Sequence, residues 1–143
     1  MREILFRGKR VDKKGWEYGG YHRFETRQPC AINDFLRPED IKHMMIKNSF
    51  ADWNMPREME AVEVIADTVG QYTGLNDKDG TMIFEGDILS TTNSNCTFWY
   101  VDYKDGSFRA NQCNASYDCS FYDFMKYNKV KVIGNIYDDS ELI

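Results

Sequence analysis

The spacing of glycines in residues 69–89 constrains the fold more than any other feature of this chain. Glycine occupies positions 70, 74, 80 and 86 and separates short segments rich in apolar and β-branched residues. Asp79-Gly80 lies between two such segments, 70–73 and 81–84, and Asp-Gly is a strong hairpin signal because glycine adopts positive φ at little steric cost. The spacing predicts a β-hairpin whose loop is about four to six residues long.

Two of these glycines lie inside the first predicted strand of that hairpin. Gly70 and Gly74 flank Tyr72, and a glycine within a strand marks a bulge, a bend or a close backbone approach. Aromatic residues make up 15% of the chain, which suits curled strands around an aromatic interior. We therefore predict a β-dominated α+β fold. Short antiparallel strands would form one or two small SH3-like barrels or curled sheets, with one or two short helices.

Alternation of apolar residues, bounded by turn signals, predicts the other strands. They lie at 3–7, 16–18, 21–24, 60–65, 88–89, 97–103, 107–110 and 130–137. The pair Gly19-Gly20 is predicted to bend the chain between two of them, and Asp105-Gly106 to form a tight turn between two others. Phe121, Phe124 and Met125 recur at helical spacing and predict a short helix at 120–127.

A second helix is predicted at 38–47. Pro38 precedes two acidic residues, a pattern typical of a first helical turn, and Ile41, Met44 and Met45 follow at helical spacing. His43 lies off this stripe, so we expect it to be a solvated surface residue. Trp53, in the loop that follows, is predicted to pack as an anchor.

The length of 143 residues corresponds to one domain. We expect a single domain over 1–143, whose strand pattern also allows two sub-lobes, 1–58 and 59–143. The net charge is −5 and no long basic run occurs, which disfavours a phosphate-tracking surface.

The N-terminal sequence and the cysteines bear on the compartment. Only residues 4–6 are apolar before the next charge, and no apolar segment approaches the roughly 18 residues of a membrane span. We expect a cytoplasmic protein without membrane contact. In that reducing compartment the thiols at Cys30, Cys96, Cys113 and Cys119 would stay free. Their spacing does not match a structural zinc site, so no metal or cofactor is expected.

The acidic loop around Asp77 and Asp79 superficially matches a calcium-binding loop. With Gly80 at the glycine position of an EF-hand, the twelfth position falls on Gly86, where a bidentate glutamate is required. We therefore interpret the loop as a solvated acidic turn.

Three groups of residues resemble the YopX family of phage and prophage proteins. They are 2–8 (REILFRG), 68–75 (TVGQYTGL) with 84–89 (FEGDIL), and 132–137 (VIGNIY), in the family's order. Phe84 stands where the family usually has tyrosine, and residues 28–54 follow no family pattern. The resemblance implies a mobile-element origin in a bacterial cell and a β-rich fold, but no particular activity.

The motif that carries this resemblance also supplies the candidate site. Its members are Gly70, Gln71, Tyr72, Gly74, Glu85, Gly86 and Asp87. Turn chemistry explains the residue types at 85–87, because glycine permits positive φ and the flanking carboxylates can accept bonds from nearby backbone amides. We favour this structural interpretation over a ligand site.

Two functional alternatives remain open. A small hydrolase would use two converging carboxylates out of Asp77, Asp79, Glu85, Asp87, Asp102 and Asp105. However, no nucleophile elbow, zinc-binding helix or phosphate loop is present, and no catalytic residue is assigned. A single-stranded nucleic-acid binder would stack bases on surface aromatics such as Tyr100 and Tyr103 beside Arg109.

The function that we expect is non-enzymatic. The chain would be a phage-encoded accessory protein that acts through protein–protein contacts with itself, as a homo-oligomer, and with an unknown phage or host protein. The aromatic content and the unpaired strand edges expected of short sheets motivate this prediction.

Overall fold

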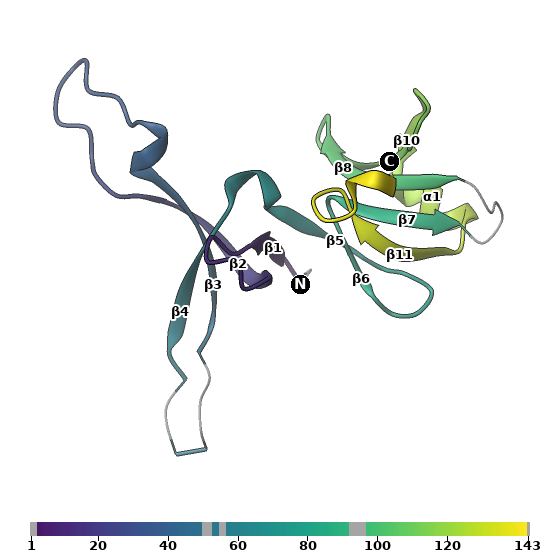
Figure 1. Ribbon diagram of the computed structural model, residues 1–143, viewed down its shortest axis with the longest axis horizontal. Coiled ribbons are helices and arrows are strands. Elements are labelled where there is room, and N and C mark those ends of the chain that lie inside the picture. The colour runs from purple at the N-terminus through teal and green to yellow at the C-terminus, as the bar shows by residue number, and fades with distance from the viewer. Residues whose placement is uncertain (1–2, 50–52, 55–56, 92–96, 143) are drawn as a thin grey trace. The chain divides into compact units, whose positions relative to one another are not determined.

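The computed structural model describes residues 3–49, 53–54, 57–91 and 97–142, which form antiparallel β-structure with one short α-helix (Figure 1). The chain divides into two compact units. We call Ile4–Val69 the N-terminal unit and Gly70–Ile143, to which Met1–Glu3 also belong, the C-terminal unit.

Four antiparallel strands build the N-terminal unit, in the spatial order β4-β3-β2-β1. They are β1 (Phe6–Lys9), β2 (Trp16–Glu25), β3 (Ile41–Asn48) and β4 (Met59–Val64), with 3₁₀ turns η1 (Pro38–Asp40) and η2 (Ala66–Thr68). Figure 1 shows that β3 and β4 extend as a hairpin arm, and that a long connection projects between β2 and β3.

The predicted separation of strands 16–18 and 21–24 at Gly19-Gly20 is wrong, because β2 runs through both glycines as one strand. Gly19 is needed for close packing between strands. A Cβ atom at this position would lie 2.3 Å from the carbonyl oxygen of Ile46 on β3, whereas one at Gly20 would lie 3.9 Å from it. The neighbouring strand can approach this closely only where the side chain is absent.

The helix predicted at 38–47 is also wrong. Only Pro38–Asp40 turn, as η1, and Ile41 begins β3. β3 lies between β2 and β4 and pairs with both, so sheet hydrogen bonds replace the helical ones. Met45 is fully buried in the strand. Tertiary pairing overrides a weak local propensity here.

The predicted barrels do not form; the sheets stay open. In the N-terminal unit the sheet curls until Arg10, after β1, makes an isolated bridge with Val64 at the end of β4. The backbone amide of Val11 also donates to the carbonyl of Glu63 at 3.2 Å. The rest of β4 continues into the hairpin arm, so β1 and β4 do not pair along their length.

The C-terminal unit contains a β-hairpin and a five-stranded antiparallel sheet of order β10-β9-β8-β7-β11. The hairpin is β5 (Gly70–Asn76) and β6 (Met82–Phe84). The sheet comprises β7 (Asp87–Thr91), β8 (Phe98–Lys104), β9 (Ser107–Gln112), β10 (Asp118–Ser120) and β11 (Val130–Asn135). Helix α1 (Phe121–Tyr127) and the 3₁₀ turn η3 (Ser140–Leu142) complete the unit.

Several local predictions are confirmed in this unit. The β5–β6 loop spans 77–81, within the predicted length. Asp105 and Gly106 have φ of 52° and 78° and join β8 to β9 as a two-residue turn. Both central residues of a type I′ hairpin turn need positive φ, which Asp-Gly supplies. The helix expected at 120–127 forms as α1.

The main hydrophobic core lies on one face of the five-stranded sheet, beneath α1. Its buried residues come from the hairpin, four strands and the helix: Ile83, Leu89, Val101, Ala110, Phe121, Phe124 and Val130. The rings of Trp99 and Phe124 lie 4.7 Å apart and join β8 to the helix. Each large side chain buried here contributes about 1.5–3 kcal/mol of transfer free energy.

Within the described ranges, no helix is both long and apolar enough to cross a membrane. Cys30, Cys113 and Cys119 are free, and Cys96 lies outside the described residues.

Candidate functional site

The predicted motif 85–87 forms the connection between β6 and β7. Gly86 has φ of +84°, as its turn prediction requires. Its amide donates to the carbonyl of Val101 at 2.7 Å, and its carbonyl accepts from the amide of Ile136 at 2.9 Å. A Cβ atom here would also lie 2.9 Å from the ring of Tyr137. The turn therefore ties β8 to the segment after β11 through backbone bonds.

The two acids of the motif have different environments. Asp87 is buried, and its Oδ2 accepts the amide of Phe84 at 2.8 Å, across the turn. Glu85 is half-buried, and its carboxylate lies 3.5 Å from the amide of Gln71. Burial raises the pKa of Glu85, and the nearby charge of Asp102 raises it further. The surroundings of Glu85 therefore disfavour its ionised form.

The other motif residues act mainly through the backbone. A Cβ atom on Gly70 would lie 2.6 Å from the carbonyl oxygen of Glu85, so β5 can approach the turn only with glycine there. The carbonyl of Gln71 accepts the amide of Glu85 at 3.0 Å. Gly74 has φ of +87° and lies where the β5–β6 register shifts. Of the three predicted alternatives, Gly70 thus shows a close backbone approach and Gly74 lies at a register shift.

Tyr72 is the one motif residue with a large side chain on β5. Its ring lies 5.5 Å from that of Phe84, directly across the hairpin. Its hydroxyl donates to Oδ1 of Asn76 at 2.6 Å. This cross-strand aromatic pair stabilises the hairpin on one face.

Asp77 organises the acidic loop and is not a solvated turn residue. Its side chain is buried, with Oδ1 accepting the amides of Asp79 at 2.9 Å and Thr81 at 2.8 Å. Oδ2 accepts the amide of Val132 on β11 at 3.0 Å. Burial by itself raises the pKa of Asp77, but the three backbone donors outweigh it and hold the pKa below its ordinary value.

The three predicted surface contacts do not share one face. Tyr100 and Arg109 lie on the side of the β8–β9 ladder opposite the core, whereas Tyr103 faces the core side and packs its ring on Phe108 at 5.2 Å. Arg109 donates from Nε to Asp118 at 2.8 Å. Its charge is therefore offset by a carboxylate, which weakens a stacking and cation surface for single strands.

The carboxylates of the hydrolase alternative are mostly occupied by structural bonds. Asp102 accepts the side-chain amide of Asn111 at 2.8 Å. Asp79 lies 3.5 Å from the ammonium of Lys131. In the described part of the chain no three or more His, Cys, Asp or Glu residues form a group able to hold a metal ion.

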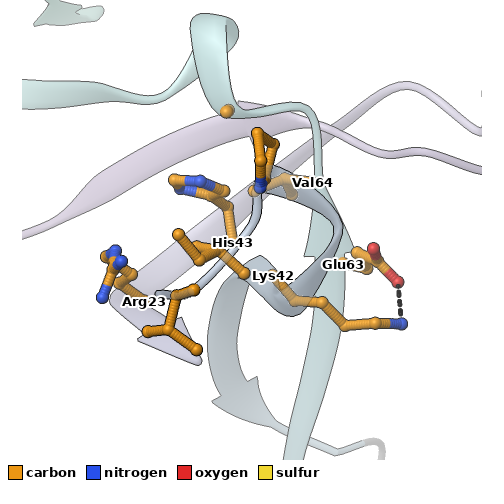
Figure 2. A pocket seen from close by; sticks show the side chains of 9 residues that line it. Arg23, Lys42, His43, Glu63 and Val64 are labelled. Atoms are coloured by element: carbon orange, nitrogen blue, oxygen red, sulfur yellow. Dashed lines mark hydrogen bonds and ion pairs between the residues drawn. The ribbon is translucent and has the colours of Figure 1, made fainter. Parts of the chain in front are cut away.

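A cavity of about 500 Å³ in the N-terminal unit was missed by the sequence prediction (Figure 2). Its lining combines apolar side chains with polar and charged ones: Arg23, Leu36, Pro38, Ile41, Lys42, His43, Glu63, Val64 and Ala66. Figure 2 shows Arg23 and His43 at one end and the Lys42–Glu63 ion pair, with 3.0 Å between Nζ and Oε2, at the other.

His43 is half-buried in this cavity and not solvated as predicted. Its Nδ1 lies 2.7 Å from the hydroxyl of Tyr21, and the two rings stack at 5.9 Å. Arg23 lies directly across from His43 in the β2–β3 ladder, and Val64 directly across in the β3–β4 ladder. Strand register was the missing signal, because 20 residues separate Arg23 from His43 and 21 separate His43 from Val64.

These features define a two-unit antiparallel β protein whose motif residues build a turn and whose N-terminal unit holds a polar-ended cavity. The chain belongs to the YopX family, since the family model described as YopX protein matches residues 5–143. No curated protein matches it. Among solved structures it is similar to the crystal structure of protein EF1440 from Enterococcus faecalis. The two share 20% sequence identity with a TM-score of 0.53, over 99% of each chain. This likeness supports the fold.

Proposed function

We propose that the protein is a non-enzymatic accessory protein of a phage or prophage, acting in the cytoplasm of the bacterial host through protein–protein contacts. It would assemble with itself and bind a phage or host protein. Family membership supports the mobile-element origin.

The observation that carries the proposal is the exposure of large apolar side chains on the projecting parts of the N-terminal unit. Ile32 is 99% exposed and Phe35 is 74% exposed in the long β2–β3 connection. In the hairpin arm Trp53 is 91% exposed and Met59 is 82% exposed, so the predicted packing of Trp53 as an anchor is wrong. Large apolar side chains exposed on projecting segments are accessible to a partner that could cover them.

Light scattering during size-exclusion chromatography at micromolar concentration tests this proposal. We expect the wild type to elute as an oligomer and the double variant Ile32→Ser/Phe35→Ser to shift toward monomer. The matched control, Tyr122→Ser/Tyr127→Ser, removes two exposed aromatics from the C-terminal unit and should leave the mass unchanged. A wild type that elutes as a clean monomer would refute self-assembly.

A further inference from the structure

The cavity of the N-terminal unit has the chemistry of a ligand site. Its volume of about 500 Å³ falls within the range of small-molecule sites, roughly 300–1,000 Å³. Such sites are mostly apolar with a few oriented polar groups. Here Pro38, Ile41 and Val64 supply apolar wall, while Arg23 and His43 supply polar groups at one end.

The polar end is oriented by its neighbours. Tyr21, two residues before Arg23 on β2, fixes the His43 ring through its hydroxyl, 2.7 Å from Nδ1. In the tautomer in which Tyr21 donates, the ring proton lies on Nε2 and is available to an acceptor. Glu25 contacts Nη1 of Arg23, and the guanidinium has further N–H donors beyond that group.

The balance of charge in the lining limits the charge that a ligand can carry. Arg23 and Lys42 are offset by Glu25 and Glu63, their respective ion-pair partners. A ligand with two negative charges would meet both glutamates without surplus cations. A single carboxylate would share the Arg23 guanidinium with Glu25, through the N–H donors that the Glu25 contact leaves.

We propose that this cavity binds a monocarboxylate with a short apolar chain, its carboxylate on Arg23 and His43 and its chain along Pro38, Ile41 and Val64. This site lies outside the motif of residues 70–87 and adds a ligand to the proposed function, whose self-assembly does not require it. The ligand is either a free organic acid or the chain end of a peptide with an apolar last residue.

Two-dimensional amide NMR of the full-length, ¹⁵N-labelled protein tests the site with hexanoate as the probe. We expect hexanoate to shift the amide signals of Arg23, His43 and Val64. It should bind at least about tenfold more tightly than 1-hexanol, which lacks the charge, or acetate, which lacks the chain. Equal binding of hexanol and hexanoate, or shifts scattered over the whole chain, would overturn the proposal.

Substitutions test which side chains of the cavity recognise the carboxylate. Arg23→Gln should weaken hexanoate binding about tenfold or more, and Tyr21→Phe, which frees the His43 ring, by a smaller factor. The matched control Arg37→Gln removes an exposed arginine outside the cavity and should leave affinity within about twofold. Unchanged affinity in Arg23→Gln, with the spectrum of a folded protein, contradicts the site.

A second probe distinguishes the two sources of the carboxylate, a free organic acid and the chain end of a peptide. N-acetyl-leucine presents a peptide chain end on an apolar residue, so tighter binding than hexanoate points to a peptide. Tighter binding of hexanoate points to a free organic acid. Neither result depends on the mass measured by light scattering, so failure of this site and failure of self-assembly are distinguishable.

Discussion

At the residue scale, one carboxylate joins two distant parts of the C-terminal unit. Asp77 accepts two amides of its own loop and the amide of Val132 on β11. These bonds close the β5–β6 loop and cover part of the free edge of β11. An uncovered strand edge exposes unpaired backbone groups, so Asp77 serves both the loop and the sheet.

We predict that Asp77→Asn lowers the free energy of unfolding by about 2–3 kcal/mol, because hydrogen bonds to a buried charged acceptor are lost and an amide NH₂ faces a backbone donor. Asp79→Asn is the control. Asp79 is half-exposed beside Lys131, and its loss should cost less than about 1 kcal/mol. Urea denaturation measures both, and equal effects of the two substitutions would contradict the role of Asp77.

The pH dependence of this difference follows from the lowered pKa of Asp77. Its stabilising contribution is present in full above the ordinary pKa of 3.8 and is lost as the pH falls through the lower folded value. The gap in stability between wild type and Asp77→Asn should therefore narrow below about pH 4. A gap that is constant from pH 7 to pH 2 would show that the charge is unimportant.

Glu85 should behave in the opposite way. Its pKa is raised above 4.5 in the folded protein, so between that value and the folded value the native state holds more protons than the unfolded state. Stability then falls as the pH rises through this window. We predict that Glu85→Gln is more stable than wild type at pH 7, by less than about 1 kcal/mol because the group is only half-buried.

Thermal unfolding at pH 4 and pH 7 checks the prediction for Glu85. The advantage of Glu85→Gln should be larger at pH 7. The control is Glu141→Gln, which replaces an exposed glutamate in η3 of the same unit. Its effect on stability should be the same at pH 4 and pH 7. A larger advantage at pH 4 would reverse the assigned sign.

At the scale of elements, the adjacent glycines of β2 provide a matched pair. Gly19→Ala forces a Cβ atom against the carbonyl of Ile46 and should destabilise by about 1–3 kcal/mol, the usual cost of overpacking. Gly20→Ala has room and loses only backbone entropy of the unfolded chain, so it should be neutral or stabilising. Denaturant midpoints of the two variants measure the contrast, and similar midpoints would mean that β3 can move away.

Sequence patterns predicted elements best where local chemistry decides the structure. Asp105-Gly106 needs positive φ at both residues, and Phe121 and Phe124 face one core, so turn and helix follow from neighbours in sequence. The helix prediction for residues 41–48 is wrong for the opposite reason. Their apolar spacing fits a helix, but β2 and β4 supply strand partners on both sides.

The same distinction applies to the sites. The turn at Gly86 was predictable because glycine between two acids has a local explanation. The burial of Asp77 was not, because its third donor, Val132, lies 55 residues away. The pairing of Arg23 with His43 depends on the register of a ladder that the predicted helix had excluded.

At the scale of the whole molecule, the two units differ in how much apolar surface they bury. The main core, from Ile83 to Val130, belongs entirely to the C-terminal unit. Among the described residues of the N-terminal unit, the buried apolar side chains are Met45, Val62 and Val64. Local stability follows buried contacts, so the units should open with different free energies.

Native-state hydrogen exchange measures this difference directly. We predict that the amides of Leu89 and Val101, in the central strands β7 and β8, have protection factors at least about tenfold above that of Met45 in β3. All three residues are fully buried strand residues, so solvent access alone predicts equal protection. Equal protection would mean that the chain opens as one cooperative body. Higher protection at Met45 would contradict the prediction. It would mean that contacts other than those of the small N-terminal core, such as contacts with a second molecule, stabilise strands β2 to β4.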